Sequence, residues 1–255
     1  MTDPSPAPRS IAVVLGAGGT LGRAISVALS GRGLRVVGVG RRADPPPDLL
    51  AAVPDVAWCE ADLSDEAGGA RVAELVDGPV RMIVQAAGLP AGGSLAELDL
   101  ALIGVAMSTK LGGWLRVVRA LDDRLVAGSR LVALGGHYGA EPSPHAPLAG
   151  LTNAALANLV RQMSAVYGPR AVTVHLVSPG PVESERMQRI ATVTAAREGG
   201  TADAVLDTYR AGSPLGRLTT AAEVAWAVAL LLDDEAAALH GSTLWLDLGR
   251  RHGIG

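Results

Sequence analysis

The sequence predicts an α/β fold in which a doubly wound parallel sheet of about seven strands carries helices on both faces. Short apolar runs alternate with longer amphipathic segments along the chain, as in parallel sheets whose strands are joined by helical crossovers. A chain of 255 residues suits one such domain and buries a sizeable core. No internal repeat and no linker divides it, so we expect a single domain over residues 11–255.

Each strand and helix is expected from its own segment. Short apolar runs predict strands at residues 11–15, 35–39, 56–59, 81–84, 131–134, 172–177 and 243–246. Apolar residues at helical spacing predict helices at residues 20–32, 66–76, 98–121, 149–167 and 221–232. Pro45, Pro46 and Pro47 are expected in a loop. Because ligands of such sheets lie outside the carboxyl ends of the strands, the turns after the strands are expected to carry the functional residues.

Composition excludes several classes of protein. The net charge is −3 without a long run of one sign, so neither nucleic acid nor a membrane surface is an expected partner. The single cysteine, Cys59, cannot form an internal disulfide, and no cluster of cysteine and histidine indicates a metal. No uninterrupted apolar run is long enough for a membrane span. Residues 1–10 are polar and rich in proline and are expected to form a flexible tail, and the expected location is cytoplasmic.

A glycine-rich turn follows the first expected strand and opens the first expected helix. It reads Gly16, Ala17, Gly18, Gly19, Thr20, Leu21, Gly22. Glycine permits a tight turn and lets the backbone approach a pyrophosphate, and the helix N-terminus offers free N–H groups and a positive dipole end. In this strand–turn–helix context the turn predicts a Rossmann-type dinucleotide site.

The turn after the second expected strand bears on the choice of nucleotide. Arg41 and Arg42 stand where an NAD site usually carries an acidic residue for the ribose diol, and an arginine there accommodates a 2′-phosphate. Arg23, beside the glycine turn, is expected to add a second positive charge. These residues favour NADP(H) over NAD(H), the alternative being solvated surface arginines.

From this turn onward the sequence resembles the short-chain dehydrogenase/reductase family over almost its whole length. The similar segments are the GxxGxxG spacing of residues 16–22, Ala61-Asp62-Leu63, Gln85-Ala86-Ala87-Gly88, Ser178-Pro179-Gly180-Pro181-Val182 with Ser184, Pro214-Leu215-Gly216-Arg217, and residues 241–249. The resemblance implies a nicotinamide dinucleotide, with a substrate lid near residues 183–213. Together with the two turns, it implies that the dinucleotide contacts Gly16, Gly18, Gly19, Thr20, Leu21, Gly22, Arg41, Arg42, Asp62, Leu63, Ala86, Ala87, Gly88, Asn153, Pro179, Gly180 and Val182.

The family's usual catalytic set of Asn, Ser, Tyr and Lys is absent from the corresponding positions. Lys110 stands for the Asn, Gly136 for the Ser, Ala149 for the Tyr and Asn153 for the Lys. In the family the Tyr gives a proton to the alkoxide formed when hydride reaches a carbonyl, and Ala149 cannot do this. The resemblance therefore implies a non-standard active site, in which Asn153 is still able to bond a ribose hydroxyl.

Lys110 is the first candidate for a replacement acid. It is the only lysine among 22 basic residues, and a buried lysine can titrate near neutrality whereas an arginine cannot. It is expected either to donate a proton or stabilise an oxyanion, or else to be an ordinary surface lysine.

The loop after the fifth expected strand supplies further candidates. His137 and His145 are the candidate acids or bases, beside Tyr138 and Glu141, and each has the alternative of being an ordinary loop residue. The remaining histidines, His175, His240 and His252, are expected to be structural or in the tail. Trp114 and Trp226 are expected to pack in the core or at a subunit contact.

Three functions stay open. The preferred one is an NADP(H)-dependent oxidoreductase with a non-standard active site, because the turn at residues 179–182 beside the nicotinamide is retained. The alternatives are a non-redox enzyme on the same fold (a cyclase, isomerase or dehydratase) and a non-catalytic NADP-binding partner. The expected partners are a small-molecule substrate and other copies of the chain, as a homodimer or homotetramer through residues 98–121 and 149–167.

Overall fold

The computed structural model describes residues 9–89 and 93–253. Within them it confirms the predicted fold, a seven-stranded sheet with the order β3-β2-β1-β4-β5-β6-β7 in which every neighbouring pair is parallel. The strands are β1 Ile11–Leu15, β2 Arg35–Gly40, β3 Ala57–Glu60, β4 Val80–Gln85, β5 Leu125–Leu134, β6 Thr173–Pro179 and β7 Thr243–Leu246.

The helices cover both faces of this sheet. They are α1 Thr20–Gly31, α2 Pro47–Ala52, α3 Gly68–Glu74, α4 Ala101–Met107, α5 Gly113–Ala120, α6 Pro147–Tyr167, α7 Glu185–Glu198, α8 Ala202–Ala211 and α9 Ala221–Leu230. A π-helical turn, η1 Ser108–Gly112, joins α4 to α5. Short 3₁₀ turns lie at η2 Asp122–Arg124, η3 His137–Gly139, η4 Gly168–Arg170 and η5 Asp234–Leu239.

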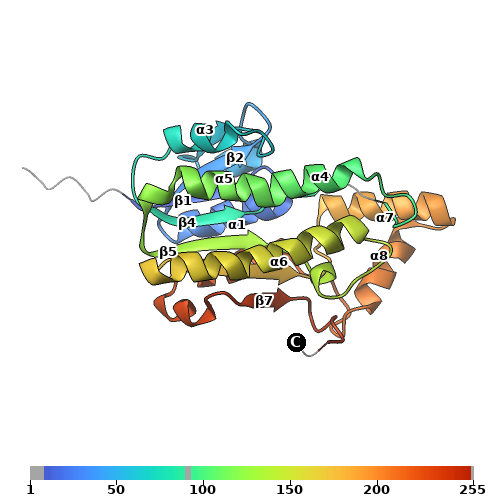
Figure 1. Cartoon of the computed structure of the whole chain (residues 1–255). Helices are drawn as coiled ribbons and strands as arrows, with labels where there is room; N and C mark the ends of the chain where they lie inside the picture. The colour runs from blue at the N-terminus through green and yellow to red at the C-terminus, as the bar shows by residue number, and fades with distance from the viewer. Residues whose placement is uncertain (1–8, 90–92, 254–255) are drawn as a thin grey trace, which may run out of the picture.

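Two apolar layers hold the helices to the sheet. On one face Ile25 of α1 and Val228 of α9 pack against β1 and β2. On the other face Trp114 of α5 and Leu156 of α6 pack in a core that also includes α3. Figure 1 shows α4, α5 and α6 crossing in front of the sheet, with α7 and α8 standing beyond the carboxyl ends of the strands. This end of the molecule is where the sequence places its candidate residues.

The strand order reverses between β1 and β4, and the turns after these two strands touch. The backbone N–H of Ala86 donates to the carbonyl of Leu15 at 2.9 Å. Gly16 has φ +80°, and a Cβ there would lie 2.6 Å from Cα of Ala87. A side chain at position 16 would therefore separate the two turns, and glycine is required both for its conformation and for this close approach.

Several elements differ from their sequence predictions. The proline run was expected in a loop, but Pro47 opens α2 as its first residue, a position whose fixed φ and missing N–H suit proline. The helix expected at residues 98–121 begins at Ala101 and contains the π turn. The region 183–213 forms two helices, α7 and α8, capped by Ser184 and Thr201. β5 begins at Leu125, before the predicted start.

The tryptophans divide between the two predicted environments. Trp114 is fully buried, as expected for core packing. Trp226 is 60% exposed on α9, so core packing is the wrong interpretation for it and a subunit contact remains the expectation.

The helical segment Ala101–Ala120 has the length and the mean hydropathy, 1.2, of a candidate membrane span. Trp114, Val117 and Val118 of this segment are fully buried in the core of the protein, which is the behaviour of a core helix.

Residues 1–8 of the expected tail lie outside the described residues. Of the rest of that segment, Ser10 is tied to the sheet, since its carbonyl accepts the N–H of Arg35 at 3.0 Å.

Candidate active site

The glycine turn after β1 forms a backbone cradle. A Cβ at Gly22 would lie 2.2 Å from the carbonyl oxygen of Gly16, so this glycine keeps the turn closed. Gly18 and Gly19 behave differently, since a Cβ there would meet nothing closer than 3.5 Å. Gly19 is the N-cap of α1 and makes no side-chain cap, and the first turn of the helix carries no acidic residue. The helix N-terminus thus presents N–H groups and a positive dipole end beside two unobstructed glycines, which fits a pyrophosphate.

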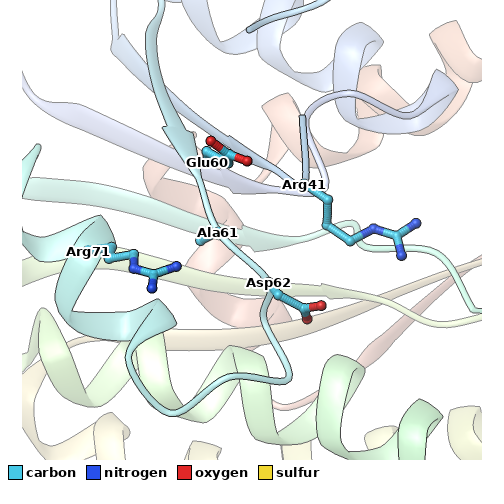
Figure 2. Close-up of a pocket in the computed structure, with 5 residues that line it drawn as sticks. All are labelled: Arg41, Glu60, Ala61, Asp62 and Arg71. Carbon is cyan, nitrogen blue, oxygen red and sulfur yellow. The ribbon is translucent and has the colours of Figure 1, made fainter. Parts of the chain in front are cut away.

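A pocket of about 500 Å³ lies next to this cradle, after β2 and β3. It is lined by Arg41, Glu60, Ala61, Asp62 and Arg71. Figure 2 shows Arg41 and Asp62 extending to the same side of the pocket, while Arg71 reaches toward Ala61 from α3. Hydrogen bonds from the Ser64 hydroxyl and N–H, followed by the charge of Arg41, lower the pKa of Asp62, so this carboxylate stays ionised. The pocket therefore combines two carboxylates, Glu60 and Asp62, with two guanidinium groups.

Trp58 holds the turn that carries the two arginines, a role that the sequence did not reveal. Its indole Nε1 donates to the carbonyl of Arg42 at 2.9 Å. The ring lies over Gly38 and Gly40 of β2, where an added Cβ would meet it at 3.0 Å and 2.6 Å. In the sequence, the signal for this packing was a pair of glycines at alternate positions of one strand, followed by a tryptophan in the next strand.

Arg23 does not act as the free second cation that was predicted. Its guanidinium pairs with Asp48 at 3.2 Å and with Glu185 at 3.7 Å. Two carboxylates thus neutralise it, and it links α1 to α2 and to the first turn of α7. This pairing corrects the expectation from the sequence, which could not show what lies opposite Arg23.

Lys110 of η1 and Asn153 of α6 meet between these two elements. The Lys110 side chain is buried, with 5% of the residue exposed, and its Nζ donates to Oδ1 of Asn153 at 2.8 Å. Burial, reinforced by the positive charge of Arg186, lowers the pKa of Lys110 to about 7. The alternative of an ordinary surface lysine is therefore wrong, because the amine is enclosed and titrates near neutrality.

The π turn that carries Lys110 is held by a buried glutamine from the neighbouring strand. Gln85, at the end of β4, donates through Nε2 to the carbonyl of Lys110 at 2.8 Å and accepts the N–H of Ala87 through Oε1 at 2.7 Å. Its side-chain amide thus connects the turn after β4 with η1. π-helical insertions of this kind frequently occur at functional sites.

Gly136 and Ala149 border the lysine–asparagine pair. A Cβ at Gly136 would lie 2.8 Å from Nδ2 of Asn153, so the present position of this amide requires glycine at 136. Ala149 precedes Asn153 by one turn on the same face of α6 and contributes only a methyl group. Both residues are partly exposed.

His137 and Tyr138 follow in η3 and line a second pocket, of about 580 Å³. Burial, aided by the positive charge of Arg250, lowers the pKa of His137 to about 4. Burial likewise raises the pKa of Tyr138 to about 12. Both side chains are therefore neutral at pH 7 and can exchange hydrogen bonds with a ligand, but neither is tuned to release a proton there.

The other histidines fall outside this arrangement. His145 is exposed and does not line the pocket. His175 bonds Thr173 Oγ1 at 2.7 Å, and His240 accepts the N–H of Val174 at 3.1 Å, which confirms their structural role. His252 donates its N–H to Glu141, whose carboxylate holds the C-terminal segment against the pocket.

The turn after β6 lies at the same end of the sheet. A Cβ at Gly180 would lie 3.1 Å from Cα of Asp247, so Gly180 allows this turn to pack on the end of β7. Ser184 accepts the N–H of Met187 at 3.2 Å as the N-cap of α7. Arg186 on the same helix donates to the carbonyl of Leu89 at 2.6 Å and thereby links α7 to the turn after β4.

The structure gathers most of the predicted residues at one end of the sheet. The turns carrying Gly16, Ala86 and Gly180 all follow the carboxyl ends of strands, with Lys110 and Asn153 joined beside them. Gln85, Trp58, Arg186 and Arg250 are additional contributors that the sequence did not identify. Among the described residues there is no group of three or more side chains suited to a metal ion.

The parallel sheet, its glycine turn and the turns after β4 and β6 define an α/β protein of the dinucleotide-binding class. A family profile described as enoyl-(acyl carrier protein) reductase matches residues 16–251. The chain belongs to the short-chain dehydrogenase/reductase family, a family of oxidoreductases.

Relatives of known activity align with nearly the whole chain. It is 31% identical to cis-4-hydroxycyclohexanecarboxylate dehydrogenase of Sinomonas cyclohexanicum, over 94% of this chain and 95% of that one. It is 27% identical to 3-oxoacyl-[acyl-carrier-protein] reductase of Escherichia coli, over 94% of this chain and 96% of that one. L-sorbose reductase of Gluconobacter frateurii, solved with NADPH and L-sorbose, superposes with a TM-score of 0.87 over 96% and 98% at 19% identity, a likeness of fold.

Proposed function

We propose that this protein is an NADP(H)-dependent oxidoreductase with a non-standard active site, acting on a small-molecule carbonyl compound or alcohol. The observation that carries the proposal is the direct contact of Lys110 with Asn153, at 2.8 Å, beside an intact dinucleotide cradle. Glycine and alanine replace the family's usual Ser and Tyr here, so Lys110 is the group within the cleft that can release a proton near neutral pH.

The residues present fit a dinucleotide. Gly18 and Gly19 leave space for a pyrophosphate at the N-terminus of α1, and Asp62 offers an ionised acceptor on the adenosine side. Arg41 and Arg42 form no ion pair within the part of the chain that the structure describes, so their guanidinium groups are free to bind a 2′-phosphate. The bound nicotinamide would supply or accept the hydride.

Lys110 would handle the proton of this reaction. In its ammonium form, Nζ donates a proton to the oxyanion that develops on a reduced carbonyl, while Asn153 Oδ1 holds the amine in place. The pKa of about 7 means that the ammonium fraction declines as the pH rises through neutrality. We therefore expect reduction to slow above pH 7. Asn153 Nδ2 and the neutral His137 remain available to bond a ribose hydroxyl or the substrate.

Nucleotide affinity tests this proposal. Replacing the guanidinium in Arg41→Ala removes charge-assisted hydrogen bonds to a 2′-phosphate, so NADPH affinity should fall by about 10- to 100-fold, whereas NADH affinity should change little. Arg119→Ala, which removes an exposed arginine on α5, is the matched control and should affect neither. Calorimetric titration of the native protein and of both variants with each dinucleotide measures these affinities. No affinity for either dinucleotide, or tighter binding of NADH than of NADPH, would rule the proposal out.

The loss of hydroxyl groups at Gly136 and Ala149 also favours a second candidate, a non-redox enzyme such as an isomerase or dehydratase that retains the dinucleotide. A product formed without any change in nicotinamide absorbance would distinguish it from the oxidoreductase. A non-catalytic NADP-binding partner would bind the dinucleotide and convert no substrate.

The organisation of the protein forms part of the proposal. Residues 11–255 would act as a single domain in which α7 and α8 serve as the substrate lid over the pocket lined by His137. Copies of the chain would associate through α4, α5 and α6, as a homodimer or homotetramer, in the cytoplasm.

A further inference from the structure

Arg250 lines the pocket of about 580 Å³ beside His137, and within the part of the chain that the structure describes it forms no ion pair. Its Nη1 donates to the carbonyl of Tyr209 in α8 at 2.7 Å. The remaining N–H groups of the guanidinium make no hydrogen bond within residues 9–89 and 93–253. Because a guanidinium offers five donors in a planar fork, most of the binding capacity of this side chain is unused.

The guanidinium of Arg250 lies on the surface of this pocket. A Cβ at Gly212, which also lines the pocket, would lie 2.6 Å from its Nη2. The residue whose carbonyl it binds, Tyr209, forms a side-chain hydrogen bond with Tyr138 of η3. Burial is the main cause of the low pKa of His137, and the positive charge of Arg250 adds to it. The charge therefore lies close to His137 and Tyr138, on the pocket that these two residues line.

Two carboxylates lie in this region, and the fold pairs both of them with other groups. Glu141 lines the pocket, and its Oε1 accepts the N–H groups of residues 252–253 at 3.0 Å and 3.1 Å. Asp247 accepts a hydrogen bond from Nε of Arg251 at 2.9 Å. Arg250 is thus left with an uncompensated positive charge, which a bound anion would satisfy.

The pocket adjoins the pair of Lys110 and Asn153 through η3. A Cβ at Gly139, the last residue of η3, would lie 3.0 Å from Cβ of Asn153. His137, the first residue of η3, forms a hydrogen bond with the backbone of Pro179 in the turn after β6. A ligand in this pocket therefore lies against a short segment that also contacts Asn153 and the turn after β6.

We propose, on the basis of the oxidoreductase function proposed above, that the substrate is a small oxo or hydroxy acid whose carboxylate Arg250 binds in this pocket. The volume of the pocket suits a compact molecule. The planar guanidinium matches a planar carboxylate through two parallel hydrogen bonds. His137 is neutral at pH 7, so it can exchange a hydrogen bond with the rest of the molecule without adding a second charge.

Titration with 4-oxopentanoate and with its methyl ester tests this assignment. The two molecules share the ketone and differ in the negative charge. At pH 7, with NADP⁺ present and again without it, the native protein should bind the acid about 10- to 100-fold more tightly than the ester, because only the acid forms charge-assisted hydrogen bonds with Arg250. Saturation-transfer NMR measures weak affinities of this kind. Equal affinity for acid and ester, or no binding of the acid, would overturn the proposal.

Three variants identify the group that recognises the acid. Arg250→Gln removes the charge and should abolish the preference for the acid, while the affinity for the ester stays unchanged. Arg250→Lys keeps a positive charge without the planar fork and should retain part of the preference. Arg119→Gln removes an exposed arginine on α5 and should leave the preference intact. With far-UV circular dichroism showing that each variant is folded, an Arg250→Gln variant that still prefers the acid would overturn the role of Arg250.

These titrations need no turnover, so their outcome is independent of hydride transfer. If the calorimetric test showed no affinity for a dinucleotide, the oxidoreductase would be excluded while a measured preference for the acid would still stand. Equal affinity for acid and ester would exclude the carboxylate site and leave the oxidoreductase in place.

Discussion

The chemistry of single residues in this cleft depends on which charges the fold leaves unpaired. Many arginines have carboxylate partners, as the half-buried Arg23 has Asp48 and Glu185. Lys110 has a neutral partner and is deeply buried, and His137 is kept neutral because burial lowers its pKa to about 4. Burial without a counter-ion destabilises the charged form of each group, so the cleft holds a lysine that exchanges its proton near neutrality.

This arrangement predicts how stability depends on pH. In the unfolded chain the Lys110 amine has its ordinary pKa of 10.5, whereas in the folded protein the pKa is about 7. Between these values the unfolded chain holds a proton that the folded protein has lost, so raising the pH favours the folded state. The free energy of unfolding rises by up to about 1.4 kcal/mol per pH unit between these two pKa values. Below pH 7 the amine is protonated in both states, so it adds no pH dependence.

Urea unfolding at pH 7, 8 and 9 measures this contribution. The free energy of unfolding should rise more steeply in the native protein than in Lys110→Met, which has a similar shape and no proton to lose. Below pH 7 the plots of unfolding free energy against pH should run parallel for the native protein and for Lys110→Met. Equal slopes above pH 7 would show that the amine is not protonated differently in the folded and unfolded states.

At the scale of elements, the π turn η1 carries Lys110, whose amine reaches Asn153 of α6. An α-helix leaves its carbonyls bonded along the helix, but here the carbonyl of Lys110 is bonded by Nε2 of the buried Gln85 at 2.8 Å. The Ser108 carbonyl receives a further bond from Arg116 at 3.3 Å. Side chains from a strand and from the next helix turn thus compensate for the local departure from α-helical geometry.

Strands were predictable from the sequence wherever a short apolar run is buried on both faces, as at β1 and β4. The start of β5 was not, because Val126 and Ala127 are exposed and Gly128 has φ +86°. The π turn was also hidden, since one inserted residue barely changes the apolar periodicity. The glycine cradle was predictable from the spacing of its glycines. The pairing of Lys110 with Asn153 was not, because it depends on two helical segments far apart in sequence.

The π turn η1 leads to a prediction about Gln85. Replacing it in Gln85→Leu leaves the buried carbonyl of Lys110 and the N–H of Ala87 without their partners, which should cost about 1–3 kcal/mol for each unsatisfied group. Gln162→Leu makes the same change at an exposed position on α6 and should alter stability by less than about 0.5 kcal/mol.

Urea unfolding of the two variants checks this difference. A Gln85→Leu variant as stable as Gln162→Leu would mean that Gln85 does not hold the π turn.

At the scale of the whole molecule, α4, α5 and α6 lie in front of the sheet (Figure 1), and among the described residues some of their apolar side chains are exposed. Leu100, the residue before α4, is 75% exposed, Val105 of α4 is 49% exposed, and Val166 of α6 is 67% exposed. α4 and α6 contact each other, and both lie on the same face of the sheet. Such a face is suited to a self-complementary contact between two copies of the chain.

The proposed contact between two copies of the chain leads to a prediction with a closely matched control. In a two-fold contact a substitution acts twice, so Val166→Glu would bring two unpaired carboxylates into an apolar interface and should shift the protein toward monomers. Val193, on the outer side of α7, is exposed to nearly the same extent, 69%, and Val193→Glu should leave the assembly unchanged. Sedimentation velocity at micromolar concentration measures the mass of each species. A native protein that sediments as a monomer, or a Val166→Glu variant with the same mass as the native assembly, would remove α6 from the interface. The loss of assembly in Val193→Glu instead would place the contact at the lid.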